Sequence, residues 1–245
     1  MLQISLASGY SASMHNPSSP VSRQPATAAD LELFALIEST LYTAVICDAL
    51  DELGYRDQAM RETIRPLGPN CCFAGWARTI SYADVYHTPA DPYGLEIEAI
   101  DSILPGEAVV VSTTGSVRNA PWGELLSTAA QSRGGRGAVV DGLVRDVRKI
   151  EALGFPVFAR GIKPVDSKGR GIVMDYSVPV ECGGVLVSPG DLVVADYDGV
   201  VSVPPEVVPD AIRLATERVM KESSSRKELK TGAYLRDVYK KYGVL

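Results

Sequence analysis

Residues 123–146 read GELLSTAAQSRGGRGAVVDGLVRD, and the rest of the chain is organised around this stretch. It begins with an acidic residue at a predicted helix start and continues through a Gly/Arg-rich turn into a short apolar strand. It ends with the pair Arg145-Asp146, just after an Asp-Gly turn. A strand end beside a helix start is where open α/β sheets form ligand crevices. We therefore expect the two ends of this stretch to meet in space.

The segments on either side alternate between strand and helix patterns. AVVVST at 108–113 predicts a buried strand, 144–154 a helix and 155–160 another strand. Such alternation favours right-handed crossovers and a partly parallel sheet. Residues 62–83 and 172–204 predict further short strands, and the turns SPGD and DYDG in the second segment indicate antiparallel pairs. The pattern as a whole predicts a mixed α/β fold.

The two ends of the chain differ from this central part. Residues 11–28 are rich in Ser, Pro and Ala, and we expect residues 1–28 to form a flexible extension. A transit peptide is the alternative, which the small number of basic residues disfavours. Asp30 is a plausible N-cap for a helix that breaks near Ser39-Thr40 and stops at Gly54. The central domain is predicted over 29–208. Residues 209–245 predict one or two amphipathic helices, whose basic surface is either solvated or packed on a neighbouring subunit.

Composition excludes several classes of partner. The chain has 245 residues, 46% of them hydrophobic and 22% charged, which is typical of a globular protein. The net charge of -6, without a long basic cluster, argues against nucleic acid or an anionic membrane as the main partner. No apolar run reaches the roughly 20 residues that a membrane span needs. An anionic small molecule stays possible, since a local Arg or a metal overrides a weak global field.

Cysteine and histidine usage narrows the chemistry further. The four cysteines form no CxxC pair, which favours reduced thiols and a cytoplasmic location. The only histidines are His15, in the predicted extension, and His87. A His-based triad or a multi-His zinc site is therefore nearly excluded. Acid-base or metal chemistry must use carboxylates, Arg, Lys, Tyr or water.

Each end of the stretch 123–146 has a functional and a structural interpretation. A helix N-terminus favours an anion, so a small carboxylate could bind the amides near Leu125 and Leu126; alternatively, Glu124 is only a first-turn acid and the leucines are core. Asp146 is a hard oxygen ligand suited to Mg²⁺ or Mn²⁺, and Arg145 can pair with a carboxylate or an enolate. Alternatively, they are an N-cap Asp and a surface Arg.

The combination of motifs resembles the RraA-like family, which includes the class II 4-hydroxy-4-methyl-2-oxoglutarate / 4-carboxy-4-hydroxy-2-oxoadipate aldolases. The likeness covers roughly residues 35–205. It rests on the Gly-Glu-Leu-Leu helix start followed by GRGAVVDG and RD, with ICDALDELG and PGEAVVV before and SPGDLVVADYDGVVSVP after. The resemblance implies a layered β-β-α swivelling-type domain with flanking helices, assembled as a homotrimer or homohexamer.

The resemblance also implies a role for each site residue. Asp146 looks like the direct ligand of a divalent metal, Mg²⁺ or Mn²⁺. Arg145 looks like the residue that contacts the substrate keto oxygen and steadies the enolate. Glu124 is similar to the family's acidic residue beside the metal waters. The backbone at Gly123, Leu125 and Leu126 would hold the carboxylate of pyruvate.

The activity implied is a metal-dependent lyase that cleaves a 4-hydroxy-2-keto acid to release pyruvate. Oxaloacetate decarboxylation is a possible second activity, because it passes through the same enolate. The partner is then a small 2-keto acid. Two alternatives stay open at this point. RraA-like proteins include non-enzymatic regulators that bind an RNA-degrading endonuclease, and the same metal site could serve another sugar-acid-like substrate. The polar loop 163–171 could shape the distal pocket or be only exposed.

Overall fold

The structure, a computed structural model, describes residues 24–244. The first 23 residues of the predicted extension 1–28 lie outside the described residues, and that part of the prediction stays untested. Within the described part, no single helix is long and apolar enough to cross a membrane; only the pair α1 (Ala28–Thr40) and α2 (Thr43–Glu52), bent by 109°, passes on length and composition.

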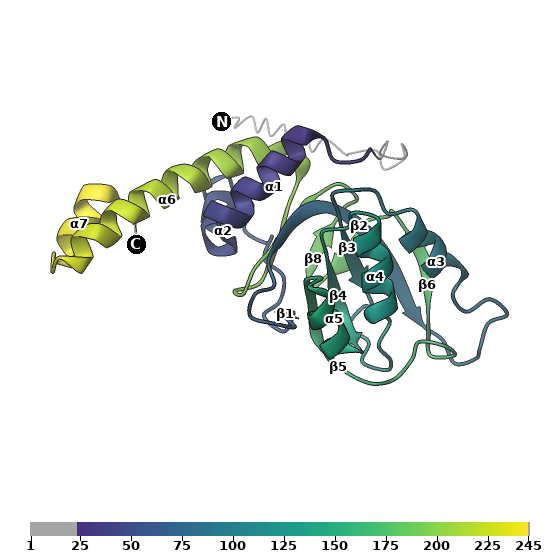
Figure 1. The fold of residues 1–245 in the computed structure, drawn as a ribbon. Coiled ribbons are helices and arrows are strands. Elements are labelled where there is room, and N and C mark those ends of the chain that lie inside the picture. The colour runs from purple at the N-terminus through teal and green to yellow at the C-terminus, as the bar shows by residue number, and fades with distance from the viewer. Residues whose placement is uncertain (1–23, 245) are drawn as a thin grey trace, which may run out of the picture.

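A mixed sheet of eight strands forms the centre of the fold (Figure 1). Its order is β1-β5-β4-β3-β2-β9-β10, and β6 also pairs with β2. The four strands β2 to β5 run parallel, whereas the pairs that involve β1, β6, β9 and β10 are antiparallel. The predicted mixed α/β class is therefore confirmed. The strands are β1 (Arg65–Pro66), β2 (Phe73–Asp84), β3 (Glu107–Ser112), β4 (Gly137–Val144), β5 (Val157–Ile162), β6 (Gly171–Tyr176), β9 (Leu192–Ala195) and β10 (Val200–Val203).

Different layers cover the two faces of this sheet. Helices α3 (Gly94–Asp101), α4 (Glu124–Ser132) and α5 (Val147–Leu153) pack on one face. The hairpin of β7 (Val180–Cys182) and β8 (Val185–Val187) packs on the other. Because both faces are covered, all six residues of β3 are buried, which explains the apolar run 108–111 at its centre. This order of layers confirms the expected β-β-α architecture.

A third cluster joins the two ends of the described chain. Helices α1, α2 and α6 (Val208–Lys230) bury apolar side chains together against β9 and β10. The short 3-10 turn η1 (Pro205–Val207) leads into α6, whose far end projects from the body and carries α7 (Leu235–Tyr242) (Figure 1). The predicted helix break near Ser39-Thr40 is confirmed. The predicted N-cap is wrong: Thr27 caps α1, and Asp30 closes a capping box from the third helical position.

Asp191, at the start of β9, gives folding stability a predictable dependence on pH. Its buried Oδ2 accepts hydrogen bonds from the Ser188 amide at 2.9 Å and the Ser202 hydroxyl at 3.1 Å. Burial raises the pKa of Asp191 to about 6, above the ordinary carboxyl value. The folded state then binds a proton more readily than the unfolded state. The free energy of unfolding should therefore fall as the pH rises from about 4 to about 6.

We expect Asp191→Asn to remove the fall in the free energy of unfolding between about pH 4 and pH 6. An amide oxygen in the place of Oδ2 keeps both hydrogen bonds without a buried charge. The variant should exceed the wild type by about 2 kcal/mol in free energy of unfolding at pH 7.5 and match it at pH 4. Urea denaturation at pH 4, 5.5 and 7.5 measures this. Asp198→Asn, at an exposed position between β9 and β10, is the control and should change little. Parallel pH profiles for wild type and Asp191→Asn would contradict the prediction.

Candidate functional site

The two ends of residues 123–146 meet at the carboxyl end of β4, as the sequence predicts. Val144 forms a parallel bridge with Trp122, and the Arg145 amide donates to the Trp122 carbonyl at 3.0 Å. The buried Trp122 indole donates in turn to the Ser127 hydroxyl at 2.8 Å. Trp122 therefore ties the loop before α4 to the end of β4, and this contact places the start of α4 beside Arg145-Asp146.

Gly123 makes this approach possible. A Cβ atom at Gly123 would lie 2.9 Å from Asp146 Oδ2 and 3.2 Å from Arg145 Cγ. Gly123 is also the N-cap of α4 and provides no side-chain cap. The first amides of a helix lack intrahelical partners, so those of α4 stay available for an anion.

Asp146 has an unusual backbone conformation. It is the N-cap of α5 with φ +60°, and its side chain makes no capping hydrogen bond. Left-handed backbone is uncommon for residues other than glycine and costs energy. The half-exposed carboxylate lies 3.7 Å from Arg145 Nε. Asp146 thus occupies the N-cap position of α5, as the alternative interpretation expects, but its side chain does not make the capping hydrogen bond. The helix therefore leaves this carboxylate available for another role.

A cavity of about 300 Å³ lies at this point. Its lining includes five of the six predicted site residues: Gly123, Leu125, Leu126, Arg145 and Asp146. Glu124 is not part of the lining. Its Oε1 atom accepts a hydrogen bond from the Thr128 hydroxyl at 3.1 Å, along its own helix.

Besides Ser167, three further polar residues line the cavity and are not among the predicted residues. Tyr93 and Glu96 belong to the start of α3, and Asp166 to the loop 163–171. Asp166 Oδ1 lies 3.2 Å from Arg145 Nη2, and its Oδ2 accepts a hydrogen bond from the Tyr93 hydroxyl at 2.6 Å. The loop 163–171 is thus part of the site, which answers the question that its sequence left open. The polar composition of this loop was the only sequence signal for its role in the site. No sequence pattern indicated a role for Tyr93 or Glu96.

The two added carboxyl groups differ in their pKa values. Burial raises the pKa of Glu96 to about 7; the Asp166 charge adds to this rise and Arg145 opposes it. Burial also acts to raise the pKa of Asp166, but the Tyr93 hydroxyl and the Arg145 guanidinium outweigh it, so the net direction is downward. At neutral pH, Asp166 is therefore ionised, whereas Glu96 is close to its titration point.

The donor set fits a divalent metal held by few protein ligands. Among residues 24–244, no group of three or more His, Cys, Asp or Glu side chains is placed to hold a metal ion. Asp146 offers a carboxylate that its helix does not use. Mg²⁺ usually keeps several waters and binds through one or two carboxylates. Asp146 with waters and a chelating substrate is therefore a chemically suitable set for Mg²⁺ or Mn²⁺.

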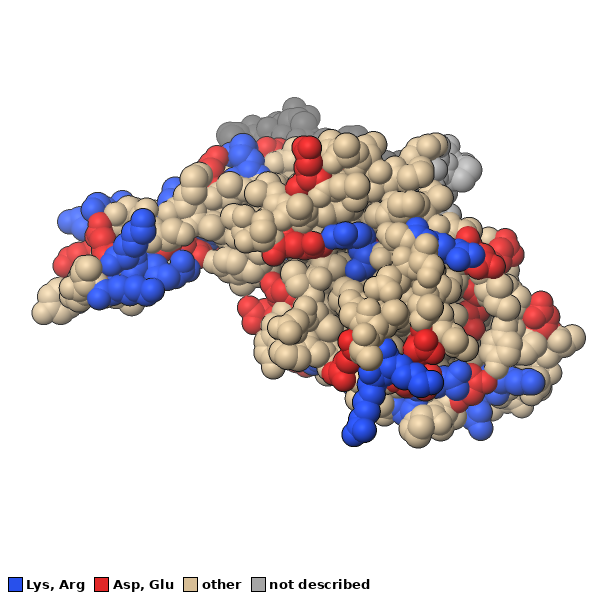
Figure 2. All heavy atoms as spheres, in the orientation of Figure 1, with Lys and Arg blue, Asp and Glu red and all other residues tan. Residues whose placement is uncertain are grey.

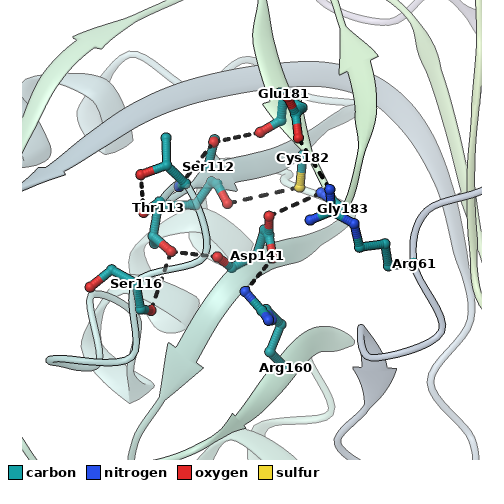
Figure 3. A network of polar contacts seen from close by, with 11 residues as sticks. Arg61, Ser112, Thr113, Ser116, Asp141, Arg160, Glu181, Cys182 and Gly183 are labelled. Carbon is teal, nitrogen blue, oxygen red and sulfur yellow. Dashed lines mark hydrogen bonds and ion pairs between the residues drawn. The ribbon is translucent and has the colours of Figure 1, made fainter.

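Asp141 lies in β4 and links this strand to residues on the face of the sheet opposite α4 and α5 (Figure 3). This buried carboxylate lies 3.5 Å from Arg160 Nη1 and accepts a hydrogen bond from the Gly183 amide at 3.1 Å. Its own carbonyl accepts from the Thr113 hydroxyl. The pairing of β4 with β5 shifts register at this point, between Val140 and Leu143. The strand therefore does not stop at the predicted Asp-Gly turn but runs on to Val144.

We expect Asp141→Ala to destabilise the fold by about 2 kcal/mol or more, because it leaves Arg160 and the Gly183 amide without their partner. The same change should loosen the end of β4 and lower any activity of the cavity. Urea denaturation measures the first effect. Asp57→Ala, at an exposed position, is the control. Equal free energies of unfolding for the two variants would mean that the buried contacts of Asp141 contribute nothing net.

Comparison with known proteins gives matches over most of the chain. The family model described as RraA-like, Aldolase/RraA, matches residues 43–202. A protein of Halalkalibacterium halodurans, named "Putative 4-hydroxy-4-methyl-2-oxoglutarate aldolase", is 38% identical over 165 residues, which are 67% of this chain and 73% of that protein.

Two solved structures are similar in fold. An uncharacterised protein of Pseudomonas syringae superposes with a TM-score of 0.75 at 27% identity, over 88% of this chain and 99% of its own. RraAS2 of Streptomyces coelicolor, titled an unusual member of the RNase ES inhibitor RraA protein family, superposes with a TM-score of 0.73 at 30% identity, over 84% and 100%.

Proposed function

Because this chain belongs to the RraA-like family, we propose that it is a divalent-metal-dependent lyase that cleaves a 4-hydroxy-2-keto acid by retro-aldol chemistry and releases pyruvate. The observation that carries the proposal is the meeting of three features in one cavity. These are the N-terminus of α4 at Gly123, the guanidinium of Arg145 and the free carboxylate of Asp146. The name of the Halalkalibacterium relative supports the same class of reaction.

The chemistry of the cavity suits this reaction. A divalent metal held by Asp146 would act as a Lewis acid toward the keto oxygen. The free amides of Leu125 and Leu126 would hold the substrate carboxylate, since a helix N-terminus favours an anion. Arg145 would donate to the keto oxygen and stabilise the negative charge that develops there. These contacts position the substrate with its C3–C4 bond free to break.

Breaking the C3–C4 bond needs a base and then an acid. The proton of the 4-hydroxyl group leaves as the bond breaks, and its electron pair becomes the enolate of pyruvate. Glu124 lies next to Gly123 and could take this proton through a water. Protonation of the enolate at C3 then gives pyruvate, and C4 leaves as the carbonyl of the second product. Loss of CO₂ from oxaloacetate would give the same enolate, so decarboxylation is a predicted second activity.

Pyruvate release tests the proposal. We expect purified protein with Mg²⁺ to release pyruvate from 4-hydroxy-4-methyl-2-oxoglutarate and from oxaloacetate, and EDTA to stop both reactions. Samples without protein correct for the decay of oxaloacetate by itself. No metal-dependent pyruvate with either compound would count against the lyase. The alternative would then be a non-catalytic protein-binding regulator, which is favoured by the likeness to RraAS2.

We also propose that the arm formed by the end of α6 and by α7 packs on another copy of this chain in a homotrimer or homohexamer. Residues 221–242 carry seven Lys and Arg against three Asp and Glu, although the whole chain has a net charge of -6. Figure 2 shows these cations gathered at the end of the arm. Light scattering at low and high salt tests this: we expect three or six copies at low salt and dissociation as salt screens the arm. A single copy at both salts would contradict it.

A further inference from the structure

The side of the cavity formed by α3 and the loop 163–171 is distinct in its chemistry from the side formed by α4 and α5. We call it the acidic wall, and it consists of Tyr93, Glu96 and Asp166. If the keto acid head binds at Asp146 and the start of α4, the rest of the substrate lies in the remainder of the cavity, where this wall provides the charged groups. The acidic wall is therefore the part of the cavity that meets the distal end of the substrate.

The charges along the cavity leave no free cation for a second substrate carboxylate. Arg145 is the only Lys or Arg among the residues that line the cavity in the described part of the chain. Its guanidinium already lies 3.2 Å from Asp166 and 3.7 Å from Asp146. Glu96 lies close enough to both Arg145 and Asp166 to feel their charges. A distal carboxylate would thus meet two acidic groups and a cation that is already paired.

The same wall is well suited to substrate hydroxyl groups. Carboxylate oxygens accept hydrogen bonds, and a substrate hydroxyl is a donor that can supply them. The Tyr93 hydroxyl donates to Asp166 and has lone pairs that can accept a further bond. Glu96 is partly buried, and burial raises its pKa, so close to neutral pH it both accepts and donates. Asp166 stays ionised, because Tyr93 and Arg145 hold its pKa down.

We propose that the acidic wall selects 4-hydroxy-2-keto acids whose distal end is neutral and bears hydroxyl groups, and that it slows, without abolishing, turnover of those that carry a second carboxylate. This inference rests on the proposed lyase function and names its substrate class. It differs from the name of the Halalkalibacterium relative, whose substrate is a dicarboxylate. The selection works largely by repulsion of the wrong substrate, which is a common route to specificity.

A matched pair of substrates tests the proposal. 4,5-Dihydroxy-2-oxopentanoate and 4-hydroxy-2-oxoglutarate have the same five-carbon skeleton and differ only in a distal CH₂OH or carboxylate. Both release pyruvate, with glycolaldehyde or glyoxylate as the second product. We expect kcat/KM of the wild type to be at least about tenfold higher for the dihydroxy acid. The measurement is pyruvate release with Mg²⁺ at fixed pH.

Two isosteric variants assign the preference to the wall. Glu96→Gln and Asp166→Asn should each narrow the ratio of the two kcat/KM values by about threefold or more, through a gain on the dicarboxylate. Glu98→Gln is the control, because Glu98 lies on the same helix but is exposed and bonds to the Tyr176 hydroxyl instead. Glu98→Gln should leave the ratio of the two kcat/KM values unchanged. If Glu96→Gln acted only by loosening α3, Glu98→Gln would be expected to change the ratio as well.

The outcomes separate this inference from the proposed function. Pyruvate from both compounds with a preference for the dicarboxylate would overturn the inference and leave the lyase function standing. A wild-type preference for the dihydroxy acid that neither wall variant alters would overturn the role of Glu96 and Asp166. No metal-dependent pyruvate from either compound, nor from oxaloacetate, would overturn the lyase function and this inference with it.

Discussion

Asp146→Asn is expected to lower metal-dependent kcat/KM by about a thousandfold or more while leaving the fold intact. The carboxylate of Asp146 is the group in the cavity that we assign to the metal, and neither its backbone nor its helix cap uses that charge. A neutral amide is a far weaker ligand for Mg²⁺. The Mg²⁺ concentration for half-maximal activity should rise strongly. Pyruvate release over a range of Mg²⁺ concentrations measures both effects.

The choice of asparagine follows from the backbone. At φ +60°, Asp146 has a conformation that Asn adopts readily and Ala does not. Asp146→Ala would therefore combine loss of the ligand with strain of about 1 kcal/mol. Asp146→Gly removes the carboxylate without that strain and should be as inactive as Asp146→Asn. Circular dichroism and thermal unfolding check the fold of both variants. Near-wild-type turnover in either one would remove Asp146 from the ligand list.

The sequence predicted the half of the site that lies within one continuous stretch. Gly123, Arg145 and Asp146 belong to a single strand–helix crossover, and such crossovers obey simple rules of topology. The helix start and the strand end therefore had to meet once the strand order placed them on one edge. The buried Trp122, which joins them, gave no signal of its own because an apolar loop residue predicts only burial.

The acidic wall could not be predicted in the same way. Asp166 lies about twenty residues beyond Arg145, and Glu96 about fifty before it, with no spacing rule between them. They meet only because α3 and the loop 163–171 both border the same cavity. A carboxyl group in an exposed loop and one in a short helix look like ordinary surface residues in a sequence. Their function depends on three-dimensional packing, which local patterns do not encode.

Local capping rules failed for a related reason. The sequence contains Thr27 and Asp30 three residues apart, and both are good cap residues. The structure uses them together, with Thr27 as the cap and Asp30 as its partner. The same ambiguity affects Asp146, which occupies a cap position without making the cap bond. A sequence can thus identify a helix start, but not which acidic residue is left free for chemistry.

Arg145→Ala is expected to lower kcat by about a hundredfold to a thousandfold, the usual cost of losing one donor to a developing oxyanion. Unlike the Asp146 variants, it should bind Mg²⁺ more tightly than the wild type does. Removing Arg145 leaves Glu96, Asp146 and Asp166 in the cavity lining without their cation. The two variants should therefore separate turnover from metal binding. Kinetics at saturating and limiting Mg²⁺ distinguish them.

Arg145→Lys separates the effect of the positive charge from that of the guanidinium geometry, because lysine keeps the charge but lacks the planar group with several N–H donors. The guanidinium of Arg145 contacts Asp166 through Nη2 and faces Asp146 through Nε, and a lysine ammonium cannot hold both positions while donating to a substrate. Its metal affinity should return toward the wild-type value while kcat stays at least about tenfold low. Arg148→Ala, at an exposed position in α5, the helix that begins just after Arg145, is the control for loss of a nearby cation. If Arg145→Ala changed only the free energy of unfolding, Arg145 would be a structural residue and the oxyanion contact would have to come from elsewhere.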